Sequence, residues 1–135
     1  MEQHTLQWFE EAGCDLYVPA SFLAADKVEM SLVCNGCGTR GIGGYLVSDD
    51  ILGVCVTVSC NIHDWGYELS ETDEDEDQCD FYLRENLRRM IYARSRDGKI
   101  LTWLRLRIAD LYFLAVSLTY CAENRRAKTT EELKG

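Results

Sequence analysis

The chain has 135 residues, the length of one domain, and 47% of them are apolar, which is enough for one hydrophobic core. Its 23 acidic and 14 basic residues give a net charge of -9, which argues against nucleic acid as the main partner. Seven cysteines are too few for a dense disulfide scaffold, and their odd number leaves at least one thiol without a disulfide. We therefore expect a single domain over residues 1–135.

The first part of the chain is predicted to be helical, followed by a loop. Apolar side chains at helical spacing predict a helix over residues 3–12. Pro19 is typical of a helix start and predicts a second, short helix. Six of the ten glycines then fall within residues 34–53, which indicates a loop whose backbone turns sharply or approaches a ligand closely.

Two patterns overlap around residue 60. Residues 53–60 alternate between apolar and other side chains, as a strand does. Cys60, His63, Asp64 and Tyr67 lie at offsets of 0, 3, 4 and 7, which places them along one side of a helix. Local propensity and side-chain spacing therefore disagree in this segment.

An acidic run at residues 71–77 separates two predicted helices. Its like charges resist packing, so we expect a solvated loop there. The run also lacks the glycine of a regular calcium-binding loop. The next helix is predicted over residues 78–96, with an apolar stripe on one side and a stop signal at Asp97-Gly98.

The most apolar stretch, residues 101–122, is long enough to span a bilayer. It carries Arg105, Arg107 and Asp110, and each charge costs roughly 2.5–3.5 kcal/mol at membrane depth. We therefore expect a buried helix over residues 102–124, followed by a polar tail, and no transmembrane segment.

The aromatic residues divide into two groups by their expected surroundings. Those of the last predicted helix are expected to lie in the core: Trp103, Tyr112, Phe113 and Tyr120. Trp8 and Phe9 near the N-terminus are better candidates for a lipid interface. The expected fold is a mainly helical bundle around one glycine-rich loop.

The residues with acid–base chemistry can be brought together by two helices. On a helix, His63 and Tyr67 point the same way one turn apart, whereas Asp64 is rotated by about 100°. If the helix over 78–96 lies antiparallel to this one, Asp80 can reach His63, fix its tautomer and stabilise the imidazolium. Tyr67 can then donate its hydroxyl to Asp80.

These residues resemble the secreted phospholipase A2 superfamily. Its catalytic helix reads Cys-x-x-His-Asp-x-x-Tyr and its next helix offers a Cys-Asp pair, which here are residues 60–67 and Cys79-Asp80. The likeness is closest to the atypical group XII branch, because an Asn-Gly-Cys-Gly loop at residues 35–38 precedes the histidine. The resemblance covers about residues 34–127 and implies a mainly α fold, with two antiparallel catalytic helices and a glycine-rich calcium loop.

The resemblance implies calcium-dependent hydrolysis of the sn-2 ester of glycerophospholipids at a membrane or micelle surface. His63 would be the general base that activates water, Asp80 its orienting carboxylate, and Tyr67 a hydrogen-bond donor to Asp80. A secreted or extracellular location is favoured by the same resemblance, although the N-terminal residues lack the basic flank and apolar core of a signal peptide.

A calcium ion would be the cofactor that the resemblance implies. Asp64 would be its side-chain ligand, and backbone carbonyls of Gly36 and Gly38 would supply further oxygens, since calcium takes six to eight. The backbone N–H of Gly38 would help to stabilise the negative charge that develops on the ester oxygen. A second register, with Gly41 and Gly43 in the loop, stays open.

The cysteines depart from the family pattern. The resemblance keeps both members of one bridge, Cys37 to Cys60, which would tie the calcium loop to the catalytic helix. The family's cysteine between the aspartate and the tyrosine is Gly66 here, so Cys79 lacks its usual disulfide partner and is expected to keep its thiol.

Two alternatives remain. The pairs Cys34-x-x-Cys37 and Cys60-x-x-His63 have zinc-knuckle spacing and would make this chain an interaction module with a structural zinc. That alternative leaves the two carboxylates and the tyrosine of the constellation unexplained. The other alternative is a phospholipase A2-like binding protein without catalytic activity.

Overall fold

The computed structural model describes residues 2–34 and 49–120, and of residues 119 and 120 only the backbone. Most of the predicted glycine loop, with both of its proposed registers, therefore lies outside the described residues. The end of the last predicted helix and the polar tail, over residues 121–135, lie outside them as well.

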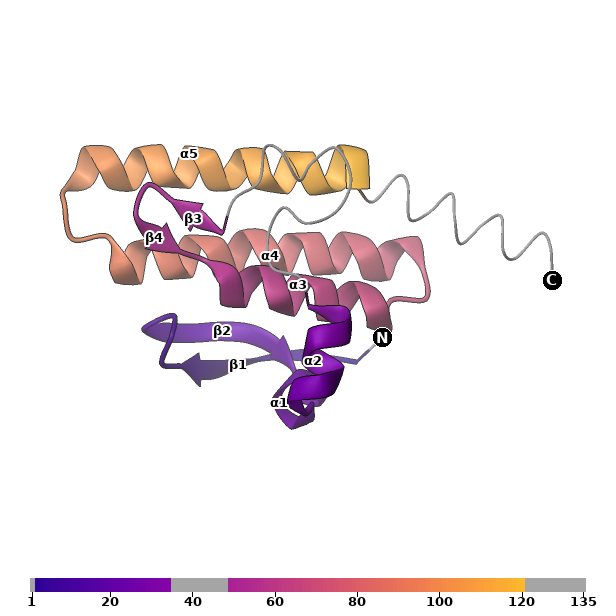
Figure 1. Cartoon of the computed structure of the whole chain (residues 1–135). Coiled ribbons are helices and arrows are strands. Elements are labelled where there is room, and N and C mark those ends of the chain that lie inside the picture. Colours follow the sequence, from indigo (N-terminus) through magenta and orange to yellow (C-terminus); the bar gives the residue numbers. More distant parts are fainter. Residues whose placement is uncertain (1, 35–48, 121–135) are drawn as a thin grey trace.

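The described residues are mainly helical, as the sequence predicts, with two small two-stranded sheets (Figure 1). The strands are β1 (His4–Phe9), β2 (Cys14–Pro19), β3 (Asp50–Ile51) and β4 (Val54–Cys55). The helices are α1 (Ala20–Ala24), α2 (Lys27–Val33), α3 (Thr57–Leu69), α4 (Asp73–Arg94) and α5 (Lys99–Ala115), and α5 continues into the π-helix η2 (Val116–Tyr120).

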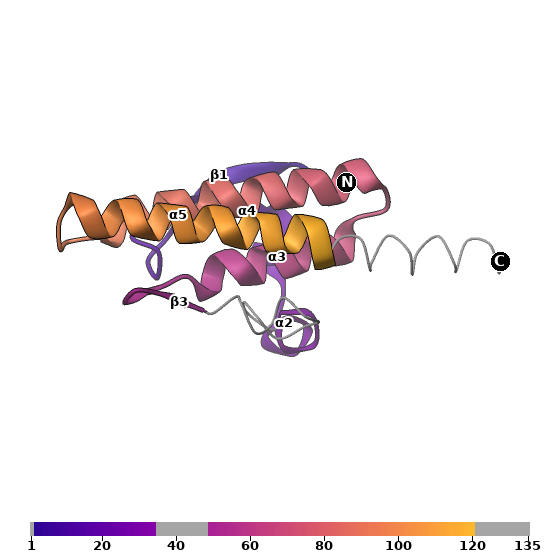
Figure 2. The same cartoon turned by 90° about the horizontal axis from the view of Figure 1, so that it is seen from above.

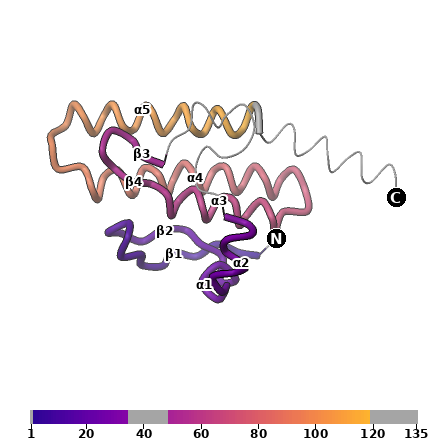
Figure 3. Tube along the Cα trace, viewed as in Figure 1, coloured from indigo at the N-terminus to yellow at the C-terminus, as the bar shows by residue number. Residues whose placement is uncertain are grey.

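Helix α4 lies at the centre of the arrangement. It packs against α5 on one side, against α3 along another, and against β2 of the N-terminal hairpin (Figures 1 and 2). The tube in Figure 3 shows that the chain passes from the hairpin through α3 and α4 to α5. The core between these elements includes the fully buried side chains of Leu16, Ile62, Leu87, Met90 and Ile91.

The predicted helix over residues 3–12 is wrong. The segment forms β1 and the start of a turn, and β1 pairs antiparallel with β2, with His4 opposite Pro19 and Phe9 opposite Cys14. Gly13 closes the turn with a φ of +67°, a value that favours glycine. Apolar residues three apart mimic a helix here, but the strand is set by pairing with β2, where Leu16 and Val18 alternate inward.

The helix predicted after Pro19 is confirmed as α1, with Pro19 as its N-cap residue. Phe9 is 9% exposed and belongs to the core, so its predicted role at an interface is wrong. Trp8 is 66% exposed, which agrees with its expected surface position.

The structure contains both the strand and the helix predicted around residue 60, one after the other. Val54 and Cys55 form the short strand β4, and the helix α3 begins at Thr57. The strand therefore ends before the chemical constellation, and the constellation lies on a helix, as its spacing predicts.

The acidic run at 71–77 is not the solvated loop that its composition predicts. Helix α4 begins at Asp73, and Thr72 is its N-cap. The hydroxyl of Thr72 accepts from the backbone N–H of Asp75, and the Asp75 carboxylate accepts from the N–H of Thr72, a reciprocal capping box. Carboxylates in a first turn are also favoured by the positive end of the helix dipole, which is why this run begins a helix.

Helix α5 begins at Lys99 and not near residue 102, and it is less buried than predicted. Arg105, Ala109 and Tyr112 point into the protein, but Trp103 is 54% exposed and so does not lie in the core. Apolar residues lie on two opposite faces of α5, and only one of these faces packs against α4. No helix among the described residues is both long and apolar enough to cross a membrane.

Buried polar side chains tie the pieces together. The side chain of Asn86 on α4 accepts from the N–H of Tyr17 at 2.8 Å and donates to its carbonyl at 2.9 Å. It thus supplies β2 with the hydrogen bonds that a neighbouring strand would make. Trp65 on α3 donates its indole N–H to Ser21 of α1 at 2.9 Å, which holds α1 against the core.

Candidate active site on helices α3 and α4

His63, Asp80 and Tyr67 meet in the interior of the protein. Nε2 of His63 lies 2.7 Å from Oδ1 of Asp80, and the Tyr67 hydroxyl donates to the same oxygen. The rings of His63 and Tyr67 contact each other, with 4.2 Å between their centroids. The side chains predicted from helical spacing are therefore brought together.

The antiparallel course of α3 and α4 produces this meeting. Ser59 near the start of α3 donates its hydroxyl to the sulfur of Met90 near the end of α4, while His63 meets Asp80 one turn further along α3. Residues later in α3 therefore contact residues earlier in α4, which confirms the predicted antiparallel pairing. Both helices are held by the same buried apolar stripe that the spacing over 78–96 predicts.

The hydrogen bond to Asp80 fixes the tautomer of His63. An ionised carboxylate only accepts hydrogen bonds, so Nε2 carries the hydrogen in the neutral ring and Nδ1 keeps its lone pair. Nδ1 makes no hydrogen bond with the described residues. His63 is 6% and Asp80 2% exposed, and this low-dielectric setting strengthens their interaction.

A third donor to Asp80 was not predicted from the sequence. Ser117, in the π-helical turn after α5, donates its hydroxyl to Oδ2 of Asp80 at 3.3 Å. It lies 37 residues from Asp80 along the chain, and a single serine in an apolar stretch gives no signal of such a contact. The carboxylate thus accepts from three side chains on two separate segments besides α4.

Asp64, the predicted calcium ligand, lies next to His63 on α3 and is half-buried. The described residues contain no group of three or more His, Cys, Asp or Glu side chains that could hold a metal ion. They therefore offer one carboxylate of the predicted calcium ligand set, and Gly36 and Gly38 lie outside them.

Both ends of the segment that carries the predicted loop are attached to α3. At one end, the thiol of Cys34 donates to the carbonyl of Asn61 at 3.3 Å. At the other end, Asp49 accepts from the backbone N–H of Val56 and, through its carboxylate, from the hydroxyl of Thr57. Cys34 and Asp49, the described residues on either side of this segment, thus both contact α3 or the residue before it.

The cysteines of the site have different chemical states. Cys60 on α3 is disulfide-bonded. Its predicted partner, Cys37, lies outside the described residues, so the pairing stays a prediction. A cysteine in a disulfide has no thiolate to give to zinc, and Nε2 of His63 is engaged by Asp80. One of the four ligands in the zinc-knuckle alternative, Cys60, is therefore committed elsewhere, whereas His63 would have to bind zinc through Nδ1.

Cys79 retains its thiol, as predicted, and lies directly against Gly66. A β-carbon at position 66 would lie 2.7 Å from the sulfur and 3.5 Å from the β-carbon of Cys79. The thiol also shares a hydrogen bond with Ser70 at 3.6 Å. Burial raises the pKa of the Cys79 thiol to about 11, so it stays protonated at neutral pH.

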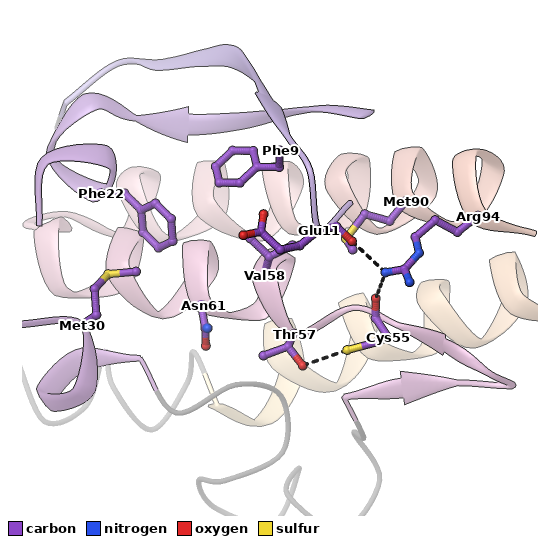
Figure 4. A pocket seen from close by; sticks show the side chains of 10 residues that line it. All are labelled: Phe9, Glu11, Phe22, Met30, Cys55, Thr57, Val58, Asn61, Met90 and Arg94. Atoms are coloured by element: carbon purple, nitrogen blue, oxygen red, sulfur yellow. Dashed lines mark hydrogen bonds between the residues drawn. The ribbon is translucent and has the colours of Figure 1, made fainter. Parts of the chain in front are cut away.

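A cavity of about 580 Å³ lies on a different side of α3 (Figure 4). Thr57, Val58 and Asn61 line it from α3, and Arg94 closes one end by donating to the carbonyls of Glu11 and Cys55. The α3 residues that line it face away from the side of the helix that carries His63. This cavity is therefore separate from the candidate active site.

Comparison of this chain with known protein families, with curated proteins and with solved structures finds no match.

Proposed function

We propose that this protein is a phospholipase A2-like hydrolase that cleaves the sn-2 ester of glycerophospholipids with the help of calcium. The observation that carries the proposal is the buried hydrogen-bonded group of His63, Asp80 and Tyr67. The sequence resemblance names these same three residues for the same roles, and the fold required is a pair of antiparallel helices of the kind formed by α3 and α4.

His63 would act as the general base. Its Nδ1 lone pair would take a proton from a water molecule while the water oxygen attacks the ester carbonyl. When the tetrahedral intermediate collapses, the bond between the carbonyl carbon and the glycerol oxygen breaks, and the proton passes from Nδ1 to that oxygen. The products are a free fatty acid and a lysophospholipid, and the histidine returns to its starting state.

Asp80 would orient the histidine and balance the charge that the ring gains in the reaction. Asp80 is buried, and its carboxylate would favour the protonated ring that forms as water is activated. The hydroxyls of Tyr67 and Ser117 stabilise the carboxylate itself, so that it can stay ionised away from water.

Calcium would be held by Asp64 and by backbone carbonyls of the segment after Cys34. When bound, the ion supplies positive charge beside the ester oxygen that becomes negative in the intermediate. The contacts of Cys34 and Asp49, the described residues on either side of this segment, with α3 support the ligand assignment, because α3 carries Asp64.

The direct test replaces His63 with Gln. The amide keeps a hydrogen-bond donor toward Asp80 but has no basic nitrogen, so we expect ester hydrolysis to fall to less than about a tenth of wild type, since general bases contribute 10²- to 10⁴-fold. The matched control is Glu68→Gln, an exposed position on the same helix, which should hydrolyse phospholipid normally.

The measurement is the release of a labelled fatty acid from the sn-2 position of phosphatidylcholine, with calcium present and the fold checked by circular dichroism. A folded His63→Gln variant that keeps more than a tenth of wild-type activity would reject His63 as the base. If the folded wild-type protein releases no fatty acid, the catalytically silent binding protein becomes the better account.

A further inference from the structure

Helix α5 presents a narrow apolar seam to solvent. Large side chains lie at alternating spacings of four and three residues along its outer face: Ile100, Leu104, Arg107, Leu111, Leu114 and Leu118. The five apolar members are between 38% and 78% exposed, and the Arg107 side chain is 64% exposed. The opposite face of α5, with Ala109 and Tyr112, is the one buried against the protein.

The spacing identifies the kind of partner. Alternation of four and three residues is the heptad repeat of a helix that packs along another helix, and a stripe limited to these positions is narrower than the apolar face of a helix lying in a lipid surface. Viewed from above, α5 lies over α4 with its outer face uncovered by any other described element (Figure 2). The seam is therefore suited to one further helix.

We propose that this helix is α5 of a second copy of the chain, packed antiparallel about a two-fold axis near Ala109. In that register Leu104 lies opposite Leu114 of the second copy, and Ile100 lies opposite Leu118. Every apolar residue of the seam then lies opposite an apolar residue of the second copy, except Leu111, which lies opposite Arg107. A two-fold interface requires this self-complementarity.

The polar members of the seam fit the same register. Arg107 of one copy would lie beside Asp110 of the other, because Asp110 directly precedes Leu111, the residue opposite Arg107. Within one chain, Asp110 already accepts an ion pair from Arg84 at 3.3 Å and lies 3.9 Å from Arg107. The long Arg107 side chain can therefore cover Leu111 of the second copy with its methylene groups and keep its charge at Asp110.

The distribution of charge favours the antiparallel orientation. Three solvent-accessible carboxylates, those of Asp73, Glu74 and Asp75, lie in the first turn of α4, and Ser117 after α5 contacts Asp80 near that turn. The opposite end, where α4 turns into α5, carries Arg94, Arg96 and Lys99. A two-fold axis at the middle of α5 would bring the basic end of each copy beside the acidic end of the other. This local complementarity acts against the repulsion expected between two chains of net charge -9.

The first test is the mass of the protein in solution. Sedimentation across the micromolar range should give twice the mass of one chain for the wild type. Leu114→Glu should give the mass of one chain, because its carboxylate would lie against Leu104 of the second copy with no cation opposite it. Leu32→Glu is the matched control: Leu32 is 74% exposed on α2, outside the seam, and this variant should stay dimeric.

The second test fixes the register by cross-linking. A chain with Leu104→Cys and Leu114→Cys should form a covalent dimer with a short thiol-to-thiol linker, because these positions face each other across the interface. Either single substitution should not, since equivalent residues are then ten residues, or about 15 Å, apart along the helices. The wild type measures the background from the native thiols.

Three results would overturn the proposal. One is a wild-type protein that has the mass of a single chain at every concentration. Another is a dimer that survives Leu114→Glu or fails to cross-link through positions 104 and 114. The third is a monomer that floats with neutral phosphatidylcholine vesicles and loses this binding in Leu114→Glu, which would make the seam a lipid-binding surface. None of these results depends on ester hydrolysis, so they leave the proposed function to its own test.

Discussion

The carboxylate of Asp80 is the residue on which the candidate site depends. It is buried, and it accepts hydrogen bonds from His63, Tyr67 and Ser117. A buried carboxylate that lost one of these donors would bear more of its desolvation cost without compensation. The hydroxyls of Tyr67 and Ser117 thus stabilise Asp80 in the position from which it contacts His63.

Tyr67→Phe removes one of these donors and keeps the ring. We expect the free energy of unfolding to fall by about 1.5–3 kcal/mol, the usual range for a hydrogen bond to a charged group. Denaturant unfolding measures this change. Tyr92→Phe on α4 is the control, because Tyr92 is 60% exposed and should lose almost nothing. Equal stability of Tyr67→Phe and wild type would show that this hydroxyl does not support Asp80.

At this scale the sequence predicted most of the candidate site. His63 and Tyr67 are one helical turn apart, and Asp80 follows at the start of the next helix, so one assumption about helix direction brings them together. Ser117 was not predictable, because its contact depends on how the end of α5 crosses α4. The oxygen ligands proposed for calcium lie mainly outside the described residues and stay predictions.

Among the elements, the packing of α3 on α4 is closest at Gly66. The absence of a side chain there lets Cys79 lie against the α3 backbone. The distance of 3.5 Å between a β-carbon at 66 and that of Cys79 is at the short end of the range found in disulfides. The spacing of α3 and α4 at positions 66 and 79 is thus suited to a disulfide, although position 66 is a glycine.

Gly66→Cys should therefore form a disulfide with Cys79. We expect its oxidised form to be about 2–3 kcal/mol more stable than its reduced form, because the bridge closes a loop of roughly 15 residues. Gly66→Ala is the control and should be less stable than wild type, since its β-carbon would lie 2.7 Å from the Cys79 sulfur. Intact-mass analysis after thiol alkylation detects the bridge. Two alkylated thiols at 66 and 79 after oxidation would show that this close approach is absent in solution.

The elements were predicted unevenly, and the reason is the range of the interactions that form them. The helices over 57–69 and 73–94 depend on periodic apolar residues and caps near in sequence, which are visible in one chain. The hairpin depends on pairing between β1 and β2, and β1 has buried residues only at its ends, so it lacks the alternation of a strand. Composition alone does not predict the acidic start of α4, because the Thr72 cap and the helix dipole stabilise a helix despite the like charges.

On the scale of the whole molecule, Arg105 joins three distant segments. It is 4% exposed, and its guanidinium donates to the carbonyls of Ile51 and Leu52 in the β3–β4 turn and to Ser95 and Asp97 after α4. This bidentate contact holds the pKa of the Asp97 carboxyl below its usual value. The sequence indicated only that a charge at 105 is incompatible with a membrane span, and gave no sign of these partners.

Arg105→Lys tests whether charge alone is enough at this junction. A lysine cannot reproduce the planar set of donors that reaches two backbone carbonyls and a carboxylate together. We expect a thermal midpoint several degrees below wild type, measured by scanning calorimetry. Arg96→Lys, at an exposed position between α4 and α5, should leave the midpoint almost unchanged. A normal midpoint for Arg105→Lys would mean that the guanidinium contacts are dispensable.

The most direct test of the whole account is phospholipid hydrolysis by the purified protein under control of the metal. Hydrolysis of sn-2-labelled phosphatidylcholine should stop when a calcium-selective chelator is added and return with added calcium, because a site of one carboxylate and backbone carbonyls is an oxygen site suited to calcium. Elemental analysis of the same sample should find no stoichiometric zinc. One tightly bound zinc per chain, with no calcium-dependent hydrolysis, would contradict the account and make the chain a zinc-stabilised interaction module.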